Sequence, residues 1–491
     1  MARSTTSRSV TWSTSSIDFE YTGDTLTWKK PAEEEDEVYK GRKTDWFAMW
    51  ITVLMQFVCG LQISVHSMSL WPYMIALDEK TPTHFLAWIA AISCLGDAIA
   101  LPLFGFWNDK TMSVKWPGIF GFFLAGLAQI VYTMAYISPL EGKWVLLGSR
   151  LITGFGCGNM AAFRAYAATG SLPNDRMKAV SMQTAGIVAG FSMGPIISAA
   201  FTFMKSDGIQ LGAMRLNMFN SAAIVMAVLC FASCFILLFL FKESYVGILS
   251  NENETAKIEI PDFDKLALSV CVYICTIGTG ISAGIAVLSS PLTQTLYGWN
   301  DSELILYNGI SNAASSALTI LTSFVFSTKC LKSLDKRWQM LGGSILFLIS
   351  QIFMWPWPFY AGPLKTAENN STQRCPLKYE WCDYTTQPPF PFYVFYAVIG
   401  LGIGFALVEN SAGSLFSEIV GPRKQGMAQG IFSACGSLSP FFSSYLFREI
   451  GFGYVVIIQA VMVLFGIFFV LFVYQRLVPL EIEVEEKIPS L

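Results

Sequence analysis

The stretch GSRLITGFGCGNMAAFR, residues 148–164, decides the fold of this chain. It reads as one apolar helix with an arginine near each end, Arg150 and Arg164, and glycines at alternate positions between them: Gly154, Gly156 and Gly158. A charge at the centre of a bilayer costs at least about 2.5 to 3.5 kcal/mol, so both arginines should face an aqueous cavity or a partner. They are 14 residues apart, which is nearly four helical turns. We therefore expect them to share one face of the helix, about 21 Å apart.

The composition predicts a membrane protein. Of the 491 residues, 53% are hydrophobic and only 14% are charged, whereas about a quarter of an ordinary soluble domain is charged. The basic residues are scattered and the net charge is -3, so we expect no nucleic-acid partner. Two histidines without metal-ligand spacing indicate no metal site. No constellation of nucleophile, base and orienting residue is evident, so we expect neither an enzyme nor a cofactor.

Twelve apolar runs of about 20 residues, each long enough to cross a bilayer, follow one another along the chain. These runs, numbered spans 1 to 12, begin near Trp46, His84, Trp116, Trp144, Lys178, Leu216, Leu266, Leu304, Trp338, Phe390, Lys424 and Tyr454. Residues 1–44 have too little apolar content to fold alone, which predicts a disordered tail. The predicted segments that follow are a six-helix bundle (45–242), a linker (243–264), a second six-helix bundle (265–476) and an acidic tail (477–491).

The distribution of Lys and Arg predicts the orientation in the membrane. Both terminal segments and the loops after spans 2, 4, 6, 8 and 10 carry 20 of these residues, and the alternate loops carry 8. By the positive-inside rule, both termini and the linker are cytosolic. Glycosylation sequons lie in the loops of the opposite side, at Asn300, Asn369 and Asn370. We therefore predict a glycosylated lumenal loop (361–389) that also holds a disulfide between Cys375 and Cys382.

An internal repeat relates the two halves of the chain. The three glycines of span 4 recur in span 10 at an offset of 246, as Gly400, Gly402 and Gly404, and Pro195 of span 5 recurs as Pro440 at an offset of 245. Asp109 after span 2 corresponds to Asp335 after span 8. Two parallel six-span repeats predict an all-α membrane protein with the major facilitator architecture, in which the two halves rock around a central site.

Further motifs are typical of that superfamily. GFWNDK (105–110) resembles its loop signature between spans 2 and 3, where Gly105 allows a tight exit and Asp109 is available to a helix N-terminus or a basic neighbour. The span 4 stretch with Arg150 resembles the superfamily's span 4 signature. In span 5, small residues recur every four positions and end in a bend; they are Gly186, Gly190, Gly194 and Pro195.

At finer grain, the chain resembles the lysosomal major facilitator domain-containing protein eight family. The residues that carry this resemblance are SMSLWPY (67–73), PLFGFWND (102–109), the block from Arg150 to Arg164, SSPLT (289–293), LYNGI (306–310), CPLKYEWCDYT (375–385) and VGPRKQG (420–426). The resemblance implies a lysosomal or endosomal membrane protein that is linked to chloride conductance and to lysosomal homeostasis.

Polar residues inside the spans are candidates for the transport pathway. Besides the two arginines, these are Asp97 in span 2, Asn159 in span 4 and Glu409 in span 10. The repeat places Glu409 at the depth of Arg164, so we expect the two to pair when the cytosolic side closes. The alternatives are that Arg164 snorkels to the interface, that Arg150 braces neighbouring helices, and that Asp97 only joins helices.

The sequence therefore predicts a monomeric transporter that moves a small anion, chloride by the resemblance, across an endolysosomal membrane. One alternative is a carrier of a small organic solute that is coupled to protons through Asp97 or Glu409. A second is a membrane receptor or scaffold that has kept the fold without transporting.

Overall fold

Aspartates at matching places begin the first helix of each half of the chain. In the computed structural model, Asp45 Oδ1 accepts hydrogen bonds from the amides of Phe47 (3.0 Å) and Ala48 (3.2 Å) at the start of α2 (Trp46–Ser64). Asp264 caps α10 (Lys265–Tyr297) in the same way. An N-cap carboxylate satisfies amides that lack an intrahelical partner. The internal repeat is therefore visible in the local structure.

The structure describes residues 18–22, 25–29, 39, 41–66, 69–78, 84–136, 141–201, 204, 209–211, 214–248, 257–259, 261–299, 301–326, 334–364, 380–383, 385–437, 439–480 and 483–485. They form two compact units. One unit comprises Asp45–Leu249 and Asp262–Leu480. The other comprises Met1–Thr44, Ser250–Pro261 and Glu481–Leu491, and contains two antiparallel strand pairs: β1 (Asp18–Thr22) with β2 (Thr25–Lys29), and β5 (Lys257–Glu259) with β8 (Glu483–Glu485).

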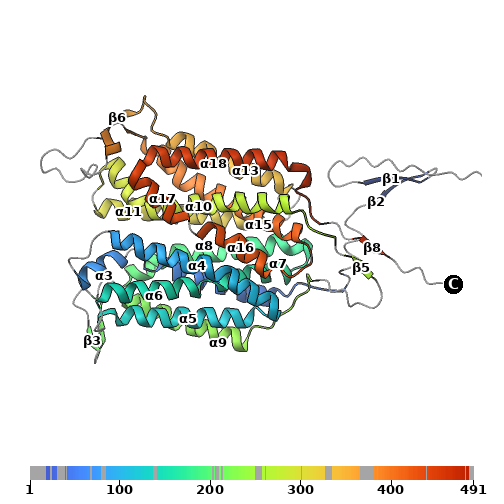
Figure 1. Cartoon of the computed structure of the whole chain (residues 1–491), viewed down its shortest axis with the longest axis horizontal. Helices are drawn as coiled ribbons and strands as arrows, with labels where there is room; N and C mark the ends of the chain where they lie inside the picture. Colours follow the sequence, from blue (N-terminus) through green and yellow to red (C-terminus); the bar gives the residue numbers. More distant parts are fainter. Residues whose placement is uncertain are drawn as a thin grey trace, which may run out of the picture. The chain divides into compact units, whose positions relative to one another are not determined.

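The membrane unit consists of two helical bundles, the N bundle and the C bundle (Figure 1). The N bundle contains α2, α3 (Leu70–Leu77), α4 (His84–Thr111), α5 (Lys115–Thr133), η1 (Met134–Tyr136), α6 (Gly142–Gly156), α7 (Asn159–Thr169), α8 (Pro173–Ala199), the strand pair β3 (Ile209–Leu211) and β4 (Met214–Leu216), and α9 (Ser221–Phe239). The C bundle contains α10, α11 (Asp301–Phe326), α13 (Lys336–Met354), the strand pair β6 (Ala361–Pro363) and β7 (Thr386–Gln387), η3 (Glu380–Asp383), α14 (Phe390–Val394), the π-helical η4 (Phe395–Gly404), α15 (Phe405–Val420), α16 (Gly426–Ser437), α17 (Ser439–Ile450), α18 (Phe452–Phe472) and η5 (Tyr474–Arg476).

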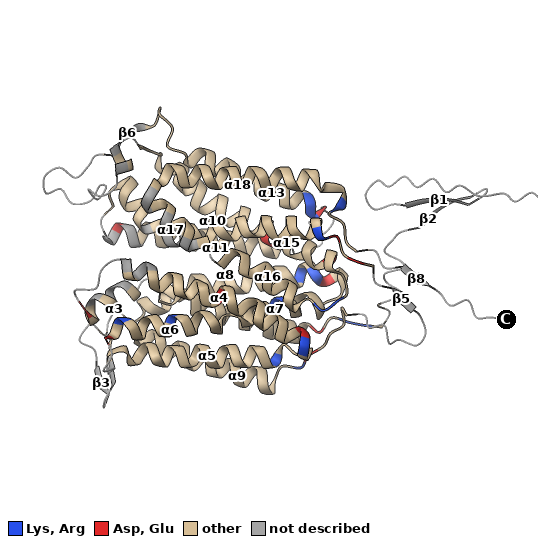
Figure 2. Ribbon diagram, viewed as in Figure 1, with Lys and Arg blue, Asp and Glu red and all other residues tan. Residues whose placement is uncertain are grey.

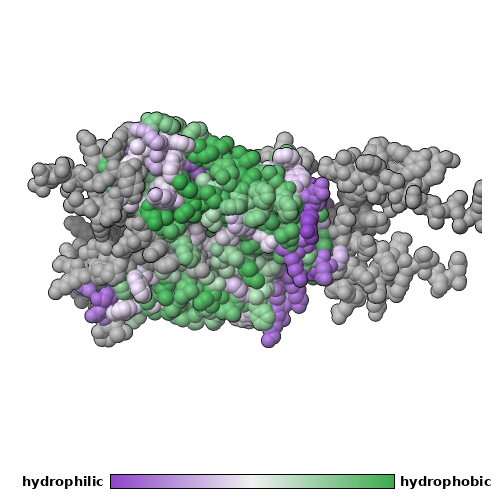
Figure 3. Space-filling view, turned by 45° about the horizontal axis from the view of Figure 1, so that its top comes forward, coloured by the Kyte–Doolittle hydropathy of each residue, from purple (hydrophilic) through white to green (hydrophobic). Residues whose placement is uncertain are grey.

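The predicted major facilitator fold of twelve spans is confirmed. Among the described residues, eight helical segments are long and apolar enough to cross a membrane by themselves. The four other spans are α6 with α7, α11, α13, and α16 with α17. The first of these is interrupted by the turn between α6 and α7, and residue 438, between α16 and α17, lies outside the described residues. On the face that Figure 3 shows, hydrophobic residues form a broad band that is bounded by hydrophilic residues.

Span 4 is not the single helix that the sequence predicts. It bends through a tight turn at Cys157 and Gly158, where the amides of Gly158, Met160 and Ala161 each bond to the carbonyl three residues earlier. Such bonds rotate the chain more per residue than an α-helix does. Because Cys157 lies between two glycines of low helix propensity, Gly156 and Gly158, the sequence tolerates this turn. In span 10 the corresponding glycines also lie in an irregular segment, the π-helical η4.

Small residues bring helices into close contact. A Cβ atom at Gly190 would lie 2.0 Å from Phe57 O, and one at Gly194 would lie 2.0 Å from Ser64 Oγ, so α8 packs against α2 without room for a side chain. The predicted ladder in span 5 is therefore a helix contact. Pro195 lies inside α8, which continues to Ala199.

Candidate functional site

The two ends of the membrane unit differ in charge. We call the end with residues 105–115 the motif end, and the opposite end, with residues 355–364 and 385–389, the long-loop end. Figure 2 shows that Lys, Arg, Asp and Glu residues gather at the motif end, whereas the helices between the ends contain few of them. This agrees with the excess of Lys and Arg that the sequence has in both terminal segments and in the loops after spans 2, 4, 6, 8 and 10.

Asp109 joins the two bundles at the motif end. It lies near the end of α4, and its Oδ1 and Oδ2 accept hydrogen bonds from the amides of Gly426 and Met427, each 2.7 Å long, at the start of α16. Lys424 Nζ donates to the Asp109 carbonyl at 3.2 Å. A Cβ atom at Gly105 would lie 2.2 Å from Gly426 O, so glycine is required for this approach. A carboxylate at a helix N-terminus is favourable, so this contact holds the bundles together.

Asp335, the counterpart of Asp109 in the repeat, acts within its own bundle. Its Oδ1 accepts from the amide of Arg337 at 2.9 Å and caps α13. Burial acts to raise the pKa of the Asp335 carboxyl, but the Arg337 side chain and amide outweigh it and hold the pKa below its usual value. The repeat therefore does not extend to the contact between the bundles.

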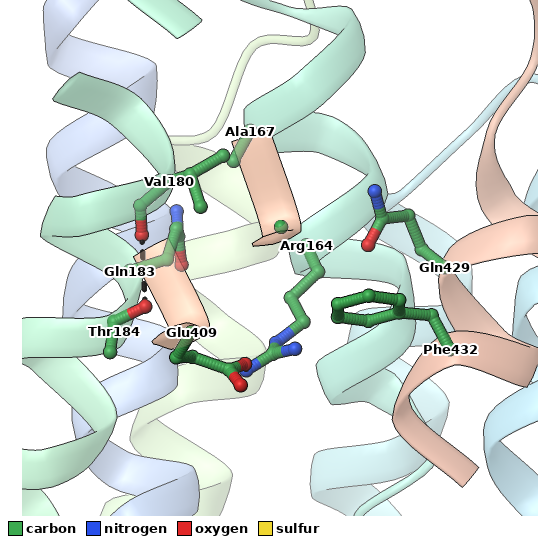
Figure 4. A pocket seen from close by; sticks show the side chains of 9 residues that line it. Arg164, Ala167, Val180, Gln183, Thr184, Glu409, Gln429 and Phe432 are labelled. Atoms are coloured by element: carbon green, nitrogen blue, oxygen red, sulfur yellow. Dashed lines mark hydrogen bonds and ion pairs between the residues drawn. The ribbon is translucent and has the colours of Figure 1, made fainter. Parts of the chain in front are cut away.

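Deeper in the protein, Arg164 and Glu409 form an ion pair across the two bundles. Arg164 Nη2, on α7, donates to Glu409 Oε1, on α15. The Glu409 carboxylate is 2% exposed, and its Oε2 accepts a hydrogen bond from Cys275 Sγ on α10 at 3.0 Å. Figure 4 shows the guanidinium and the carboxylate pointing at one another. The structure thus brings together the two residues that the repeat placed at equal depth.

A small cavity of about 20 Å³ adjoins this pair. It is enclosed by α7, α8, α15 and α16, and its lining residues are Arg164, Ala167, Val180, Gln183, Thr184, Glu409, Gly413, Gln429 and Phe432 (Figure 4). A cavity of this size holds about one water molecule. Solutes larger than water are therefore excluded from it in this conformation.

Another contact between the bundles lies in the half of the membrane unit nearer the motif end. Arg176 Nη1, on α8, donates to Ser417 O, on α15, at 3.5 Å. At the same end of the C bundle, Lys336 pairs with Glu418. Sequence reasoning missed both, and it also missed Cys275 and Gln429. The charged residues lie near predicted span ends, where basic residues are common, and a cysteine in an apolar run reads as a small hydrophobic residue.

Arg150 lies apart from Arg164, inside the N bundle. Its guanidinium carbon is 5.2 Å from the centre of the Tyr132 ring, and its side chain is almost completely buried. The two arginines therefore contact different partners, Tyr132 of the N bundle for Arg150 and Glu409 of the C bundle for Arg164. Arg150 faces the interior of its own bundle, and Arg164 faces the C bundle.

Asp97 and Asn159 do not line the cavity beside Arg164. Asn159 Oδ1 accepts from Cys59 Sγ at 3.3 Å within the N bundle, and its Nδ2 has no described partner. Asp97 Oδ1 on α4 is also buried without a described partner. Asn300, Asn369, Asn370 and Cys375 lie outside the described residues. Cys382 is buried in η3 and is disulfide-bonded.

Comparisons with known proteins agree with this architecture. The chain is 25% identical over 481 residues to the major facilitator superfamily domain-containing protein 8 of Xenopus laevis, covering 90% of this chain and 94% of that protein. This match agrees with the family resemblance found in the sequence. Two solved structures share the fold: the human organic anion transporter MFSD10 (12% identity, TM-score 0.60, 87% of this chain and 100% of that one) and a bacterial homologue of the iron transporter ferroportin in an outward-facing state (14%, 0.58, 87% and 99%).

The profile of the Major Facilitator Superfamily matches residues 52–367, which begin in span 1 and continue beyond span 9. With the two six-helix bundles and the contacts between them, this match shows that the chain belongs to the Major Facilitator Superfamily, a family of membrane transporters.

Proposed function

We propose that this protein moves a small anion across an endolysosomal membrane by alternating access, with its motif end in the cytosol. The observation that carries the proposal is the ion pair between Arg164 and Glu409, which bridges the bundles beside a cavity of about 20 Å³. Together with Asp109 and the amides of α16, this pair forms a gate, which we call the motif-end gate. An opening large enough for a solute requires the pair to separate.

Burial along α4 supports a pathway that is closed at the motif end. Of residues 88–95, in the long-loop half of α4, only Ile89 is buried. In the motif half, Ala100, Leu101, Phe104 and Asn108 are all buried. The polar contacts between the bundles that involve described side chains, at Asp109, Arg164 and Arg176, also lie in the half nearer the motif end.

The anion is proposed from Arg150 and from the relatives. Arg150 is a buried cation without an ion-pair partner among the described residues, and buried charges require compensation. A solved relative is titled an organic anion transporter. Chloride and the lysosomal location come from the resemblance to the domain-containing protein eight family.

Flux through the purified protein in liposomes tests this function. With chloride inside and an impermeant anion outside, we expect chloride efflux that Arg150→Ala abolishes or strongly reduces while expression stays normal. Arg150→Lys should restore only part of the flux, because lysine lacks the planar fork of the guanidinium. Unchanged flux in Arg150→Ala would reduce this residue to a structural brace.

The same assay separates the alternatives. A chloride flux per protein molecule far above the turnover of a carrier would favour a channel-like conductance. Proton flux that depends on an organic solute would instead indicate a carrier, coupled through Asp97 or Glu409. A cellular loss-of-function phenotype without any flux would indicate a receptor or scaffold.

A further inference from the structure

Five polar side chains of the N bundle, on or next to α2, α3, α5 and α6, gather near the long-loop end. We call them the Arg150 cluster: Arg150, His66, Gln129, Tyr132 and Tyr73. Their exposed fractions are 6% for Arg150, 2% for His66 and 1% for each of the others. Each has at least one buried polar atom without a hydrogen-bond partner among the described residues: Arg150 Nε and Nη2, His66 Nδ1, Gln129 Nε2, Tyr132 OH and Tyr73 OH.

Tyr132 lies at the centre of the cluster. Its ring centre is 4.1 Å from that of His66, 5.3 Å from that of Tyr73 and 5.2 Å from the Arg150 guanidinium carbon. His66 Nε2 lies 2.7 Å from Gln129 Oε1 and donates to it. This bond occupies the amide oxygen and leaves the Gln129 NH₂ group as a donor.

The cluster has an excess of donors around one positive charge. Three of its unpartnered atoms, Arg150 Nε and Nη2 and Gln129 Nε2, can only donate, and two more are tyrosine hydroxyls that can donate. No described carboxylate pairs with Arg150. A buried donor without an acceptor is unfavourable, and more so beside a charge. The tyrosine hydroxyls and Nδ1 of the neutral His66 ring can accept hydrogen bonds, but none of them carries a negative charge, so the described residues leave the charge of Arg150 uncompensated.

We propose that the Arg150 cluster binds one small monovalent inorganic anion, such as a halide. One negative charge neutralises the guanidinium, whereas a divalent anion would leave a net charge in an apolar bundle. The unpartnered atoms are enclosed, which excludes bulky organic acids. Water accepts hydrogen bonds but leaves the charge uncompensated. The site deepens the proposed function, on which it rests for any role in transport, by naming the residues that hold the anion.

Thermal unfolding of the purified full-length protein tests binding without any flux. Sodium chloride or bromide replaces sodium gluconate at constant ionic strength and constant sodium. A ligand that binds only the folded state stabilises it by RT ln(1 + [L]/Kd), so Tm should rise with halide concentration along that curve. Divalent sulfate at matched ionic strength should give no such rise.

Variants assign the effect to the cluster. Arg150→Gln should abolish the halide-dependent rise in Tm, and Tyr132→Phe, which keeps the ring and removes one donor, should raise the apparent Kd about tenfold, because the variant loses one hydrogen bond to a charged group. Arg176→Gln is the matched control, because Arg176 is a buried arginine at the motif end whose Nε also lacks a described partner. It should keep the full halide response.

Equal Tm in halide and gluconate would overturn the inference and would indicate that water, not an anion, occupies the cluster. A full halide response in both Arg150→Gln and Tyr132→Phe would place the anion elsewhere. Should Arg150→Gln not fold, Tyr132→Phe alone decides. A halide response in a protein that moves no chloride would contradict the proposed function but would still support anion binding at the Arg150 cluster.

Discussion

At the scale of single residues, one carboxylate joins two bundles and three helices. Glu409 accepts from Arg164 of the N bundle and from Cys275 of its own bundle, and it is 2% exposed. The charged partner could be predicted from the sequence, because few charges lie inside spans and the repeat fixes their depth. The thiol could not, because a cysteine in an apolar run carries no polar signal.

The thiol of Cys275 should stabilise the paired carboxylate. Cys275→Ala removes a donor to a buried charge, so we expect it to lower the free energy of unfolding by about 1 kcal/mol more than Cys271→Ala does. Cys271 is one helical turn earlier and equally buried, so it controls for the lost volume. Cys275→Ser keeps a donor and should fall between Cys275→Ala and the wild type. Thermal unfolding of the purified proteins measures this, and equal effects of the two alanine substitutions would show that the thiol contributes only packing.

At the scale of elements, the glycines of span 4 predicted the fold but not their local conformation. The sequence reads as one helix, and the structure has α6 and α7 with a tight turn between them. That turn depends on contacts with other helices: a Cβ atom at Gly154 would lie 2.2 Å from Ser93 O, and one at Gly158 would lie 2.8 Å from Ala100 Cβ. Because these contacts come from a different span, periodicity within span 4 could not reveal them.

Two glycines of α6 should respond oppositely to alanine. Gly154→Ala would force α6 away from the backbone of α4, and overpacking of this kind costs about 1 to 3 kcal/mol. A Cβ atom at Gly148 meets nothing within 4 Å, so Gly148→Ala should be neutral or stabilise the helix by up to about 1 kcal/mol. Expression level and thermal unfolding report the difference. If the two variants were equally stable, close contact would not be the reason for glycine at residue 154.

At the scale of the whole molecule, the twelve spans, the two repeats and the superfamily followed from composition, hydropathy and motif spacing. These features repeat along the chain and therefore leave a signal in it. The closed motif end could not be predicted, because both conformations of a rocking transporter use the same sequence. The structure locates the contacts that hold this conformation, at Asp109 and at Glu409.

Glycosylation tests the orientation of the molecule. If the long-loop end is lumenal, glycosidase treatment should lower the apparent mass, and Asn369→Gln combined with Asn370→Gln should remove most of that shift. Asn300→Gln should account for any remainder. The readout is electrophoretic mobility of the protein expressed in cells. Asn253 begins another sequon (NET, 253–255), which lies in the predicted cytosolic linker, so a glycan there would invert the proposed topology.

The most direct test of the account is an exchange of charge between Arg164 and Glu409, read by thiol labelling. A reporter cysteine at Thr184, which lines the cavity beside the pair, should react with an impermeant reagent from the motif end only when that end opens. Labelling is compared with the same protein lacking the reporter. We expect little labelling with the native pair and at least tenfold faster labelling in Arg164→Glu, because two buried acids repel one another. Arg164→Glu combined with Glu409→Arg should return labelling to the native rate. A double variant that labels as the sum of its single variants would show that the two residues are uncoupled and would contradict the proposed gate.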